Sequence, residues 1–259
     1  SAAELHRRVP EPSSADEIAR LAATMNRMLE RLERAQKQQR RFVSDASHEL
    51  RSPITVIRHH AEVALAHPER MPASDLATTV RAESMRLQLM VDDLLLLARA
   101  DEGTLTLQPH PIDLDDLVFD EAKRLRSLTD LHVDTAGVSG GRIDADPAAI
   151  RRVLRNLTDN AARHARGTVA LRLAQTNGRV VLDVDDDGPG IATDDRERVL
   201  DRFVRLDDAR TRDAGGAGLG LAIAAELVAA HGGDIAIDAS PAGGTRVRLR
   251  FSAADDPEP

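Results

Sequence analysis

The most restrictive feature of this sequence is a long run of helical periodicity near its N-terminus. From Asp16 to Ala66 apolar residues recur at heptad-like spacing. The only candidate break is the polar stretch RAQKQQRR (34–41), and the prolines of HPERMP (67–72) are expected to end the helix in a turn. The apolar positions are Ile18, Leu21, Met25, Met28, Leu32, Val43, Ala46, Leu50, Ile57 and Ala64.

A second helical pattern follows the turn, from Ala73 to about Ala100. Two long helices joined by a short turn form an antiparallel hairpin. One hairpin cannot bury its own apolar stripe, so we expect two copies of the chain to pair their hairpins into a four-helix bundle. The stripe of the second helix consists of Leu76, Val80, Leu87, Val91, Leu94 and Leu95.

The pattern changes after residue 111 to a mixture of helices and strands. Helices are predicted at about 114–127, at 147–164 with Asp146 as N-cap, and at 219–233. Strands are predicted at 168–174 and 179–185 around Asn177-Gly178, and at 234–239 and 245–251 around SPAGG. This mixture favours an antiparallel-rich sheet with helices on one face.

The composition excludes several classes of protein. The net charge is -8 with arginines scattered among acids, so no direct nucleic-acid partner is expected. The absence of cysteine excludes disulfides and thiolate metal sites. No apolar run approaches the roughly 18 residues of a membrane helix, and the sequence starts at Ser1, so we expect a trimmed piece of a longer protein.

The stretch SDASHELRSPITVI (44–57) places a titratable ring close to a helix breaker. If Val43 and Leu50 lie on the seam, His48 faces water. Pro53 removes a backbone donor and its ring meets the carbonyl of Glu49, at a cost of about 3 kcal/mol. Two interpretations stay open here: an exposed histidine near a tolerated kink, or an imidazole nucleophile whose neighbouring carboxylate accepts the ring proton.

Polar side chains gather on one face of the helix predicted at 147–164. Asn156, Asn160, Arg163 and His164 have the spacing for it. Asparagine is a mediocre helix former, so two of them within a helix indicate a use. Their carbonyl oxygens suit Mg²⁺ held together with nucleotide phosphates. A solvent-facing polar stripe is the alternative.

Two glycine-rich segments follow. In DDDGPGI (185–191), Asp186 closes a strand and can accept a hydrogen bond from an exocyclic amine, while an ordinary acidic turn is the alternative. GGAGLGLAI (215–223) opens a helix whose amides favour phosphate, but it matches neither the Walker loop nor the dinucleotide fingerprint. The preceding DDARTRDAGG (207–216) has the composition of a lid or of a floppy surface loop.

The order of four motifs along the chain resembles that of the sensor histidine kinases of bacterial two-component systems. The motifs are HELRSP, the two asparagines, DxGxG and GxGLGL. The resemblance implies the end of a HAMP-like signal-relay module at 1–36 and a dimerisation and histidine phosphotransfer hairpin at 37–100. A linker at 101–111, a Bergerat-type ATP-binding domain at 112–253 and a tail at 254–259 follow. The expected fold is therefore multi-domain: an all-α hairpin that dimerises as a four-helix bundle, then an α/β sandwich.

The resemblance also implies roles in catalysis. His48 matches the phosphoacceptor, and Glu49 matches the acid/base that assists transfer. Ser52 stands where the family often has Thr or Asn, a residue that helps position water for removing phosphate from the partner. Asn160 matches the principal Mg²⁺ ligand, and Asn156 lies next to the metal and the γ-phosphate.

The remaining nucleotide-binding positions follow in the same way. Asp186 matches the adenine-reading aspartate, and His164 stands where an aromatic ring often stacks on the base. The other matched positions are Arg163, Gly188, Gly190, Ile191, Arg205, Gly216, Gly218, Leu219, Gly220, Leu221 and Thr245.

The expected function is thus ATP- and Mg²⁺-dependent autophosphorylation of His48, followed by transfer to an aspartate in the receiver domain of a response regulator. Phosphatase activity toward that regulator is a further expectation. The chain is expected to be a homodimer and the cytoplasmic portion of a bacterial membrane sensor. Two other classes stay open: a Bergerat ATPase that acts as a conformational clamp without phosphohistidine, and a non-catalytic dimeric relay scaffold.

Overall fold

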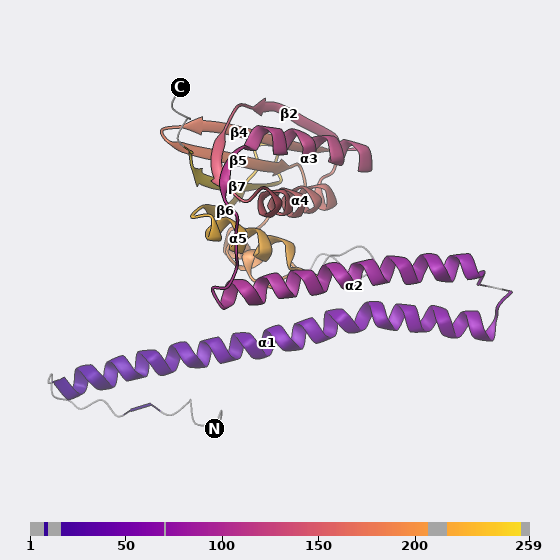
Figure 1. Cartoon of the computed structure of the whole chain (residues 1–259), viewed down its shortest axis with the longest axis horizontal. Helices are drawn as coiled ribbons and strands as arrows, with labels where there is room; N and C mark the ends of the chain where they lie inside the picture. Colours follow the sequence, from indigo (N-terminus) through magenta and orange to yellow (C-terminus); the bar gives the residue numbers. More distant parts are fainter. Residues whose placement is uncertain (1–7, 10–16, 70, 207–216, 255–259) are drawn as a thin grey trace. The chain divides into compact units, whose positions relative to one another are not determined.

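The computed structural model describes residues 8–9, 17–69, 71–206 and 217–254 (Figure 1). The chain divides into two compact units, residues 1–87 and 88–259.

The first unit contains the long helix α1 (Glu17–Ala66) and the start of α2 (Ala73–Asp101), joined by a short turn. Both helices and the turn confirm the predicted hairpin. The candidate break at 34–41 is wrong, because α1 continues through it as one helix of 50 residues. The predicted cap Asp16 lies outside the described residues.

Helix α1 also continues through Pro53, which lies buried within it. A proline removes a single N–H donor, and the rest of the hydrogen-bond ladder can hold the helix on either side. Hydroxyl groups bond back to carbonyl oxygens on both sides of the proline: Ser47 Oγ donates to Val43 O at 2.6 Å, and Thr55 Oγ1 donates to Arg51 O at 2.8 Å. Pro53 therefore disturbs α1 without ending it.

Large apolar side chains remain exposed along the helices of the first unit. Five of the ten apolar positions predicted for the first helix are among them, and leaving side chains of this size in water is costly. The exposed residues are Leu21, Met25, Met28, Leu32, Val43, Ile54, Leu65 and Met85. In the described part of the chain, no helix is long and apolar enough to span a bilayer.

The second unit is built on a five-stranded sheet with the strand order β2-β4-β5-β7-β6. Strands β4 to β7 confirm the predicted positions, and only the β2–β4 pair is parallel. The sheet strands are β2 (His132–Val138), β4 (Thr168–Thr176), β5 (Arg179–Asp186), β6 (Asp234–Ala239) and β7 (Thr245–Ser252). A separate two-stranded sheet pairs β1 (His110–Asp113) with β3 (Arg142–Ala145).

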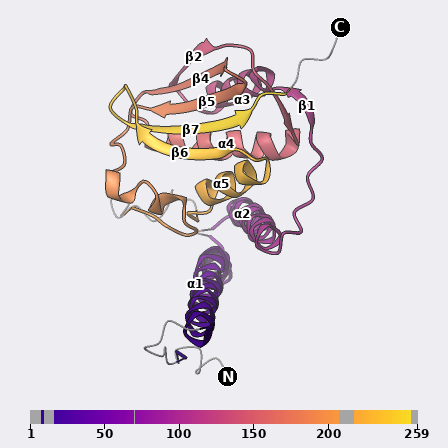
Figure 2. The same ribbon diagram turned by 90° about the vertical axis from the view of Figure 1, so that its left-hand side faces the viewer.

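Three helices cover one face of the five-stranded sheet (Figure 2). They are α3 (Leu114–Leu128), α4 (Pro147–His164) and α5 (Gly220–Ala230). The core lies between these helices and the alternate strand residues that point toward them, such as Val184, Val247 and Leu249. Two short 3-10 helices, η1 (Thr193–Asp195) and η2 (Arg198–Leu200), precede the segment 207–216, which is outside the described residues.

The start of α4 agrees with its predicted cap. The carboxylate of Asp146 accepts the N–H groups of Ala148 at 2.9 Å and Ala149 at 3.3 Å, and Pro147 occupies the first helical turn. The hairpin turn between β4 and β5 also agrees, since Asn177 and Gly178 have φ values of 51° and 72°. These local signals fix where α4 begins and how β4 pairs with β5.

Candidate functional site

The carboxylate of Asp186 lies at the end of β5 and is only 4% exposed. Its Oδ1 accepts two backbone hydrogen bonds, from Gly188 N at 2.8 Å and from Thr245 N at 3.1 Å. Within the described residues, Oδ2 accepts no hydrogen bond. One oxygen is thus held by the backbone and the other stays available to a donor from a ligand.

Three glycines make room for this carboxylate. A Cβ atom at Gly188 would lie 2.5 Å from the carbonyl oxygen of His164, and one at Gly244 would overlap both Oδ1 and the backbone oxygen of Asp186. Gly190 has a φ of +76°, which a larger residue adopts only with strain. The three glycines explain why the backbone can close so tightly around Asp186.

The imidazole of His164 lies at the end of α4, next to the Asp186 site. Burial lowers its pKa and the positive charge of Arg163 lowers it further, while Asp186 acts in the opposite direction. A lowered pKa keeps the ring neutral at pH 7. A neutral flat ring in this place can stack against a flat, uncharged ring of a ligand.

The two asparagines of α4 have different surroundings. Asn156 Nδ2 donates to the carbonyl oxygen of Gly220 at 3.1 Å, which joins α4 to the first residue of α5. The half-buried carboxamide of Asn160 makes no hydrogen bond to another described residue, and Arg163 is exposed beyond it. The structure therefore brings Asn156 and the glycine-rich segment together, and leaves Asn160 free to bind a ligand.

The described part of the glycine-rich segment is held against the loop that follows η2. Phe203 N donates to Gly218 O at 2.9 Å, and Gly218 has a φ of +69°. A Cβ at Gly218 would approach backbone atoms of Phe203 and Val204 at 3.0 Å. Leu219 is buried, Arg205 is exposed, and the predicted contact Gly216 lies outside the described residues.

The predicted residues of α1 belong to the first unit. His48 and Ser52 are exposed and Glu49 is half-buried, which confirms that His48 faces water in a single chain. None of the three side chains bonds to another described residue. The imidazole is thus sterically accessible and is not held by a neighbour.

No group of three or more His, Asp or Glu residues in the described part of the chain has the arrangement of a metal site. Amide oxygens are also ligands for Mg²⁺, which usually keeps several waters and binds together with phosphates. The free carboxamide of Asn160 fits such a site, in which the nucleotide itself supplies oxygen ligands.

Sequence reasoning missed two residues of this region. Gly244 was not singled out, although it lies in the GGT segment beside Thr245. Asp185, one residue before Asp186, was not considered either, and its charge partner lies on another strand. The detectable signal was the alternation of Asp183 and Asp185 in β5 opposite alternating arginines in β7.

Comparison with known families adds three matches. A family described as "His Kinase A (phospho-acceptor) domain" matches residues 38–103. One described as "Histidine kinase-, DNA gyrase B-, and HSP90-like ATPase" matches residues 145–255, and the HAMP domain matches residues 1–34. The chain belongs to the sensor histidine kinases of two-component systems. This agrees with the order of motifs along the sequence.

Named sensor kinases are similar to this histidine kinase chain over most of its length. The kinase/phosphatase MprB of Mycolicibacterium smegmatis is 37% identical over 88% of the chain and 48% of MprB. The probable kinase TcrY of Mycobacterium tuberculosis is 37% identical over 90% of the chain and 52% of TcrY. BaeS of Escherichia coli is 33% identical over 95% of the chain and 53% of BaeS. The chain spans about half the length of these relatives.

Solved structures agree on the fold of this kinase chain. The histidine kinase AdeS of Acinetobacter baumannii aligns with a TM-score of 0.67 at 23% identity, covering 80% of this chain and 98% of that one. A mycobacterial MprB structure aligns with a TM-score of 0.51 at 28% identity, covering 57% and 100%. Full-length ShkA in complex with AMPPNP aligns with a TM-score of 0.61 at 25% identity, covering 85% and 47%.

Proposed function

We propose that this chain is the autophosphorylating part of a sensor histidine kinase. The γ-phosphoryl group of ATP passes first to His48 and then to an aspartate in the receiver domain of a response regulator. The observation that carries the proposal is Asp186, a buried carboxylate with Oδ1 held by two backbone donors and Oδ2 open. Such an oxygen can accept a hydrogen bond from the exocyclic amine of adenine.

The second unit supplies the nucleotide site. Asp186 reads the adenine amine, and the neutral ring of His164 stacks on the base. Backbone amides at the start of α5, from Gly218 to Leu221, face the phosphates, as at other helix N-termini. Ile191, Arg163 and Arg205 complete the walls of the site, and ShkA, solved with AMPPNP, supports an ATP-type ligand for this fold.

Asn160 would hold Mg²⁺ together with the phosphates, and Asn156 would lie beside it. When bound, the ion would neutralise part of the phosphate charge. The hydrogen bond from Asn156 Nδ2 to Gly220 O leaves Oδ1 of Asn156 without a hydrogen-bond partner among the described residues, which supports this role. The residues contribute mostly position and charge, since phosphoryl transfer needs little covalent help from the protein.

The chemistry takes two balanced steps. The neutral Nε2 of His48 attacks the γ-phosphorus, the N–P bond forms, and the bond to the ADP oxygen breaks. Glu49 accepts the Nδ1 proton, so the ring stays neutral after transfer. An aspartate oxygen of the regulator then attacks phosphorus, the N–P bond breaks, and Glu49 returns the proton to Nδ1 so that His48 leaves as a neutral imidazole. Ser52 orients water when the regulator is dephosphorylated.

We further infer the division 1–36, 37–100, 101–111, 112–253 and 254–259 for the relay, phosphotransfer, linker, ATP-binding and tail segments. A second copy of the chain covers the exposed apolar stripe of the hairpin helices. The chain acts on the cytoplasmic side of a bacterial membrane as part of a longer sensor. The match of residues 1–34 to the HAMP domain and the likeness to sensor kinases such as MprB support this placement.

Incubation with γ-labelled ATP tests the function. The wild-type chain is expected to acquire an acid-labile, base-stable label, and His48→Gln is expected to acquire none. An ATPase clamp would instead hydrolyse ATP equally well in both proteins without label. A relay scaffold would bind no nucleotide at all. His67→Gln, a change at an exposed histidine beyond the end of α1, is the matched control and should keep the label.

A further inference from the structure

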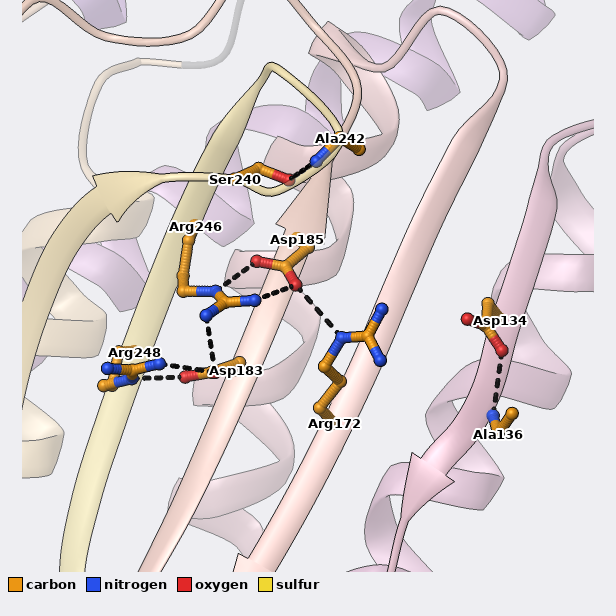
Figure 3. A network of polar contacts seen from close by, with 9 residues as sticks. All are labelled: Asp134, Ala136, Arg172, Asp183, Asp185, Ser240, Ala242, Arg246 and Arg248. Carbon is orange, nitrogen blue, oxygen red and sulfur yellow. Dashed lines mark hydrogen bonds and ion pairs between the residues drawn. The ribbon is translucent and has the colours of Figure 1, made fainter.

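The sheet face opposite the helices carries a ladder of ion pairs (Figure 3). The ladder includes Asp185, the residue that precedes Asp186 in β5. Arg246 Nε donates to Asp185 Oδ1 at 2.6 Å, and its terminal nitrogen donates to Oδ2 at 2.8 Å. Arg172 reaches the same carboxylate from β4 at 3.4 Å. Asp185 is thus linked to both neighbouring strands.

The carboxylate of Asp185 is almost completely covered, with 3% of its side chain exposed. A charge covered to this extent is tolerated only when it is paired and hydrogen-bonded. The Arg246 guanidinium satisfies both oxygens in a side-on bidentate arrangement, and such contacts have strict geometry as well as energy. The pair therefore allows little sliding of β5 against β7.

The position of this pair along the strands links it to the nucleotide site. Asp185 and Arg246 are direct partners, and they are the last pair of the β5–β7 ladder. At the next step the backbone pairing stops, and Thr245 N donates instead to the side chain of Asp186 at 3.1 Å. Any shift between the two strands at Arg246 would move Thr245 relative to the Asp186 carboxylate.

We propose that Asp185 and Arg246 are positioning residues for adenine recognition. Their ion pair fixes the end of the β5–β7 register so that Thr245 and Gly188 hold Oδ1 of Asp186 and leave Oδ2 facing the base. This inference rests on the proposed role of Asp186 in binding ATP. It adds two residues that do not touch the nucleotide to the determinants of base specificity.

The same two strands contain a matched control. Arg248 Nε donates to Asp183 Oδ1 at 2.7 Å, and its terminal nitrogen donates to Oδ2 at 2.9 Å. This pair has the same residue types, the same strands and a similar geometry, but it lies two residues further from Asp186 along β5. Its link to the first pair is a longer contact from Arg246 Nη1 to Asp183 Oδ2 at 3.4 Å, whereas Arg246 contacts Asp185 through two shorter bonds. A general contribution of such pairs to stability would appear at both places.

The experiment compares Asp185→Asn with Asp183→Asn in the full chain, titrating ADP and IDP by calorimetry. IDP lacks the exocyclic amine, so the ratio of the two affinities reports the contact made by Asp186. We expect the wild type to prefer ADP, Asp185→Asn to reduce that preference about tenfold, and Asp183→Asn to retain it. The KM for ATP in autophosphorylation should rise in Asp185→Asn with kcat unchanged.

A more conservative pair of variants tests the same inference if Asp185→Asn does not fold. Arg246→Lys keeps the charge but loses the bidentate fork, and Arg248→Lys is its control. Only Arg246→Lys should lower the ADP preference. Equal ratios in the two variants of each pair would overturn the inference.

Failure of the proposed function itself gives a different result. If the wild type bound neither nucleotide, both proposals would be overturned. If the wild type preferred ADP and Asp186→Asn kept that preference, the base contact of Asp186 would be wrong, and the positioning role with it. A preference lost in Asp186→Asn and in Asp185→Asn, and kept in Asp183→Asn, supports both.

Discussion

Asn156 and Gly220 are joined by a hydrogen bond of 3.1 Å from the side-chain amide to the backbone carbonyl. The bond connects the middle of α4 to the first residue of α5, the helix opened by the glycine-rich segment. Asn156 therefore has a second use besides the one expected at the metal and phosphates. It holds the two helix segments of the nucleotide site together.

Asn156→Asp is expected to weaken nucleotide binding more than the small change in side-chain size suggests. The aspartate cannot donate to Gly220 O and places a negative charge next to a carbonyl oxygen and to the phosphates. We expect ADP affinity to fall by about tenfold or more, because one hydrogen bond is lost and a repulsion is added. Calorimetric titration measures this effect. Asn177→Asp makes the same chemical change in the β4–β5 turn and should bind ADP like the wild type.

Gly244→Ala is expected to damage the site through the backbone. The new methyl group would overlap Asp186 and approach Gly188 N at 2.5 Å, so the strand ends must separate. We expect a loss of roughly 1–3 kcal/mol in the free energy of unfolding, together with weaker ADP binding. Circular dichroism during denaturation is the suitable measurement, since the chain has no Trp or Tyr.

Gly140→Ala provides the comparison for that measurement. A Cβ at Gly140 meets nothing within 4 Å, and its φ is not in the left-handed region. The substitution should be neutral or stabilise by about 0.4–1 kcal/mol, because the unfolded chain loses freedom. Equal losses at 244 and 140 would contradict the assigned role of the close packing around Asp186.

The stability of the second unit should decrease in acid partly through Asp146. Burial raises the pKa of Asp146, but the N–H groups of Gln108, Ala149 and Ala148 outweigh it, and the net pKa is lowered. A lowered folded-state pKa gives stability that is present above the unfolded value of about 3.9 and is lost as pH falls through the folded value. Asp146→Ala should therefore cost about 1 kcal/mol at pH 7 and less at pH 2.

Asp144→Ala serves as the control for the acid series. Asp144 is exposed in β3, and its carboxylate bonds to no other described residue. Its replacement should change the free energy of unfolding little at either pH. Urea denaturation at pH 7 and pH 2 separates the two variants, and a loss for Asp146→Ala that did not depend on pH would exclude the carboxylate as the acid-sensitive group.

Pro53→Ala tests whether the proline next to the reacting turn matters for signalling. The alanine restores a backbone donor to the carbonyl of Glu49 and should stiffen α1 around His48. If bending at this point brings His48 to the nucleotide, the rate of autophosphorylation should change. Pro72→Ala, in the turn before α2, is the comparison. Rates unchanged in Pro53→Ala would remove the gating hypothesis.

Most of the fold was predictable because its signals are local. The heptad spacing of α1, the cap at Asp146 and the Asn177-Gly178 turn each act over a few residues, and the structure agrees with all three. Strands β1, β2 and β3 were missed. β1 and β3 have four residues each, and β2 pairs with β4 through a register shift between Asp134 and Gly137. Their pairing depends on partners distant in sequence.

The residues of the candidate site also divide into those that local sequence predicts and those that depend on distant partners. Asp186, the α4 asparagines and the glycines could be predicted, because each lies in a short segment of unusual composition. The contact from Asn156 to Gly220 and the pair of Asp185 with Arg246 could not, because each joins residues about sixty positions apart, at separations of 64 and 61. Only the folded sheet and helix packing place those partners side by side.

Because α1 runs without a break, the number of residues in it determines how its side chains are oriented relative to one another. A helix turns by about 100° per residue, so the direction in which His48 points is set by the number of residues between it and the start of α1 at Glu17. One residue inserted into 34–41 would rotate every side chain upstream by about 100° relative to His48, whereas seven inserted residues would leave a difference of only about 20°. In this chain, the number of residues in one continuous helix therefore sets the angle between side chains near Glu17 and the side chain of His48.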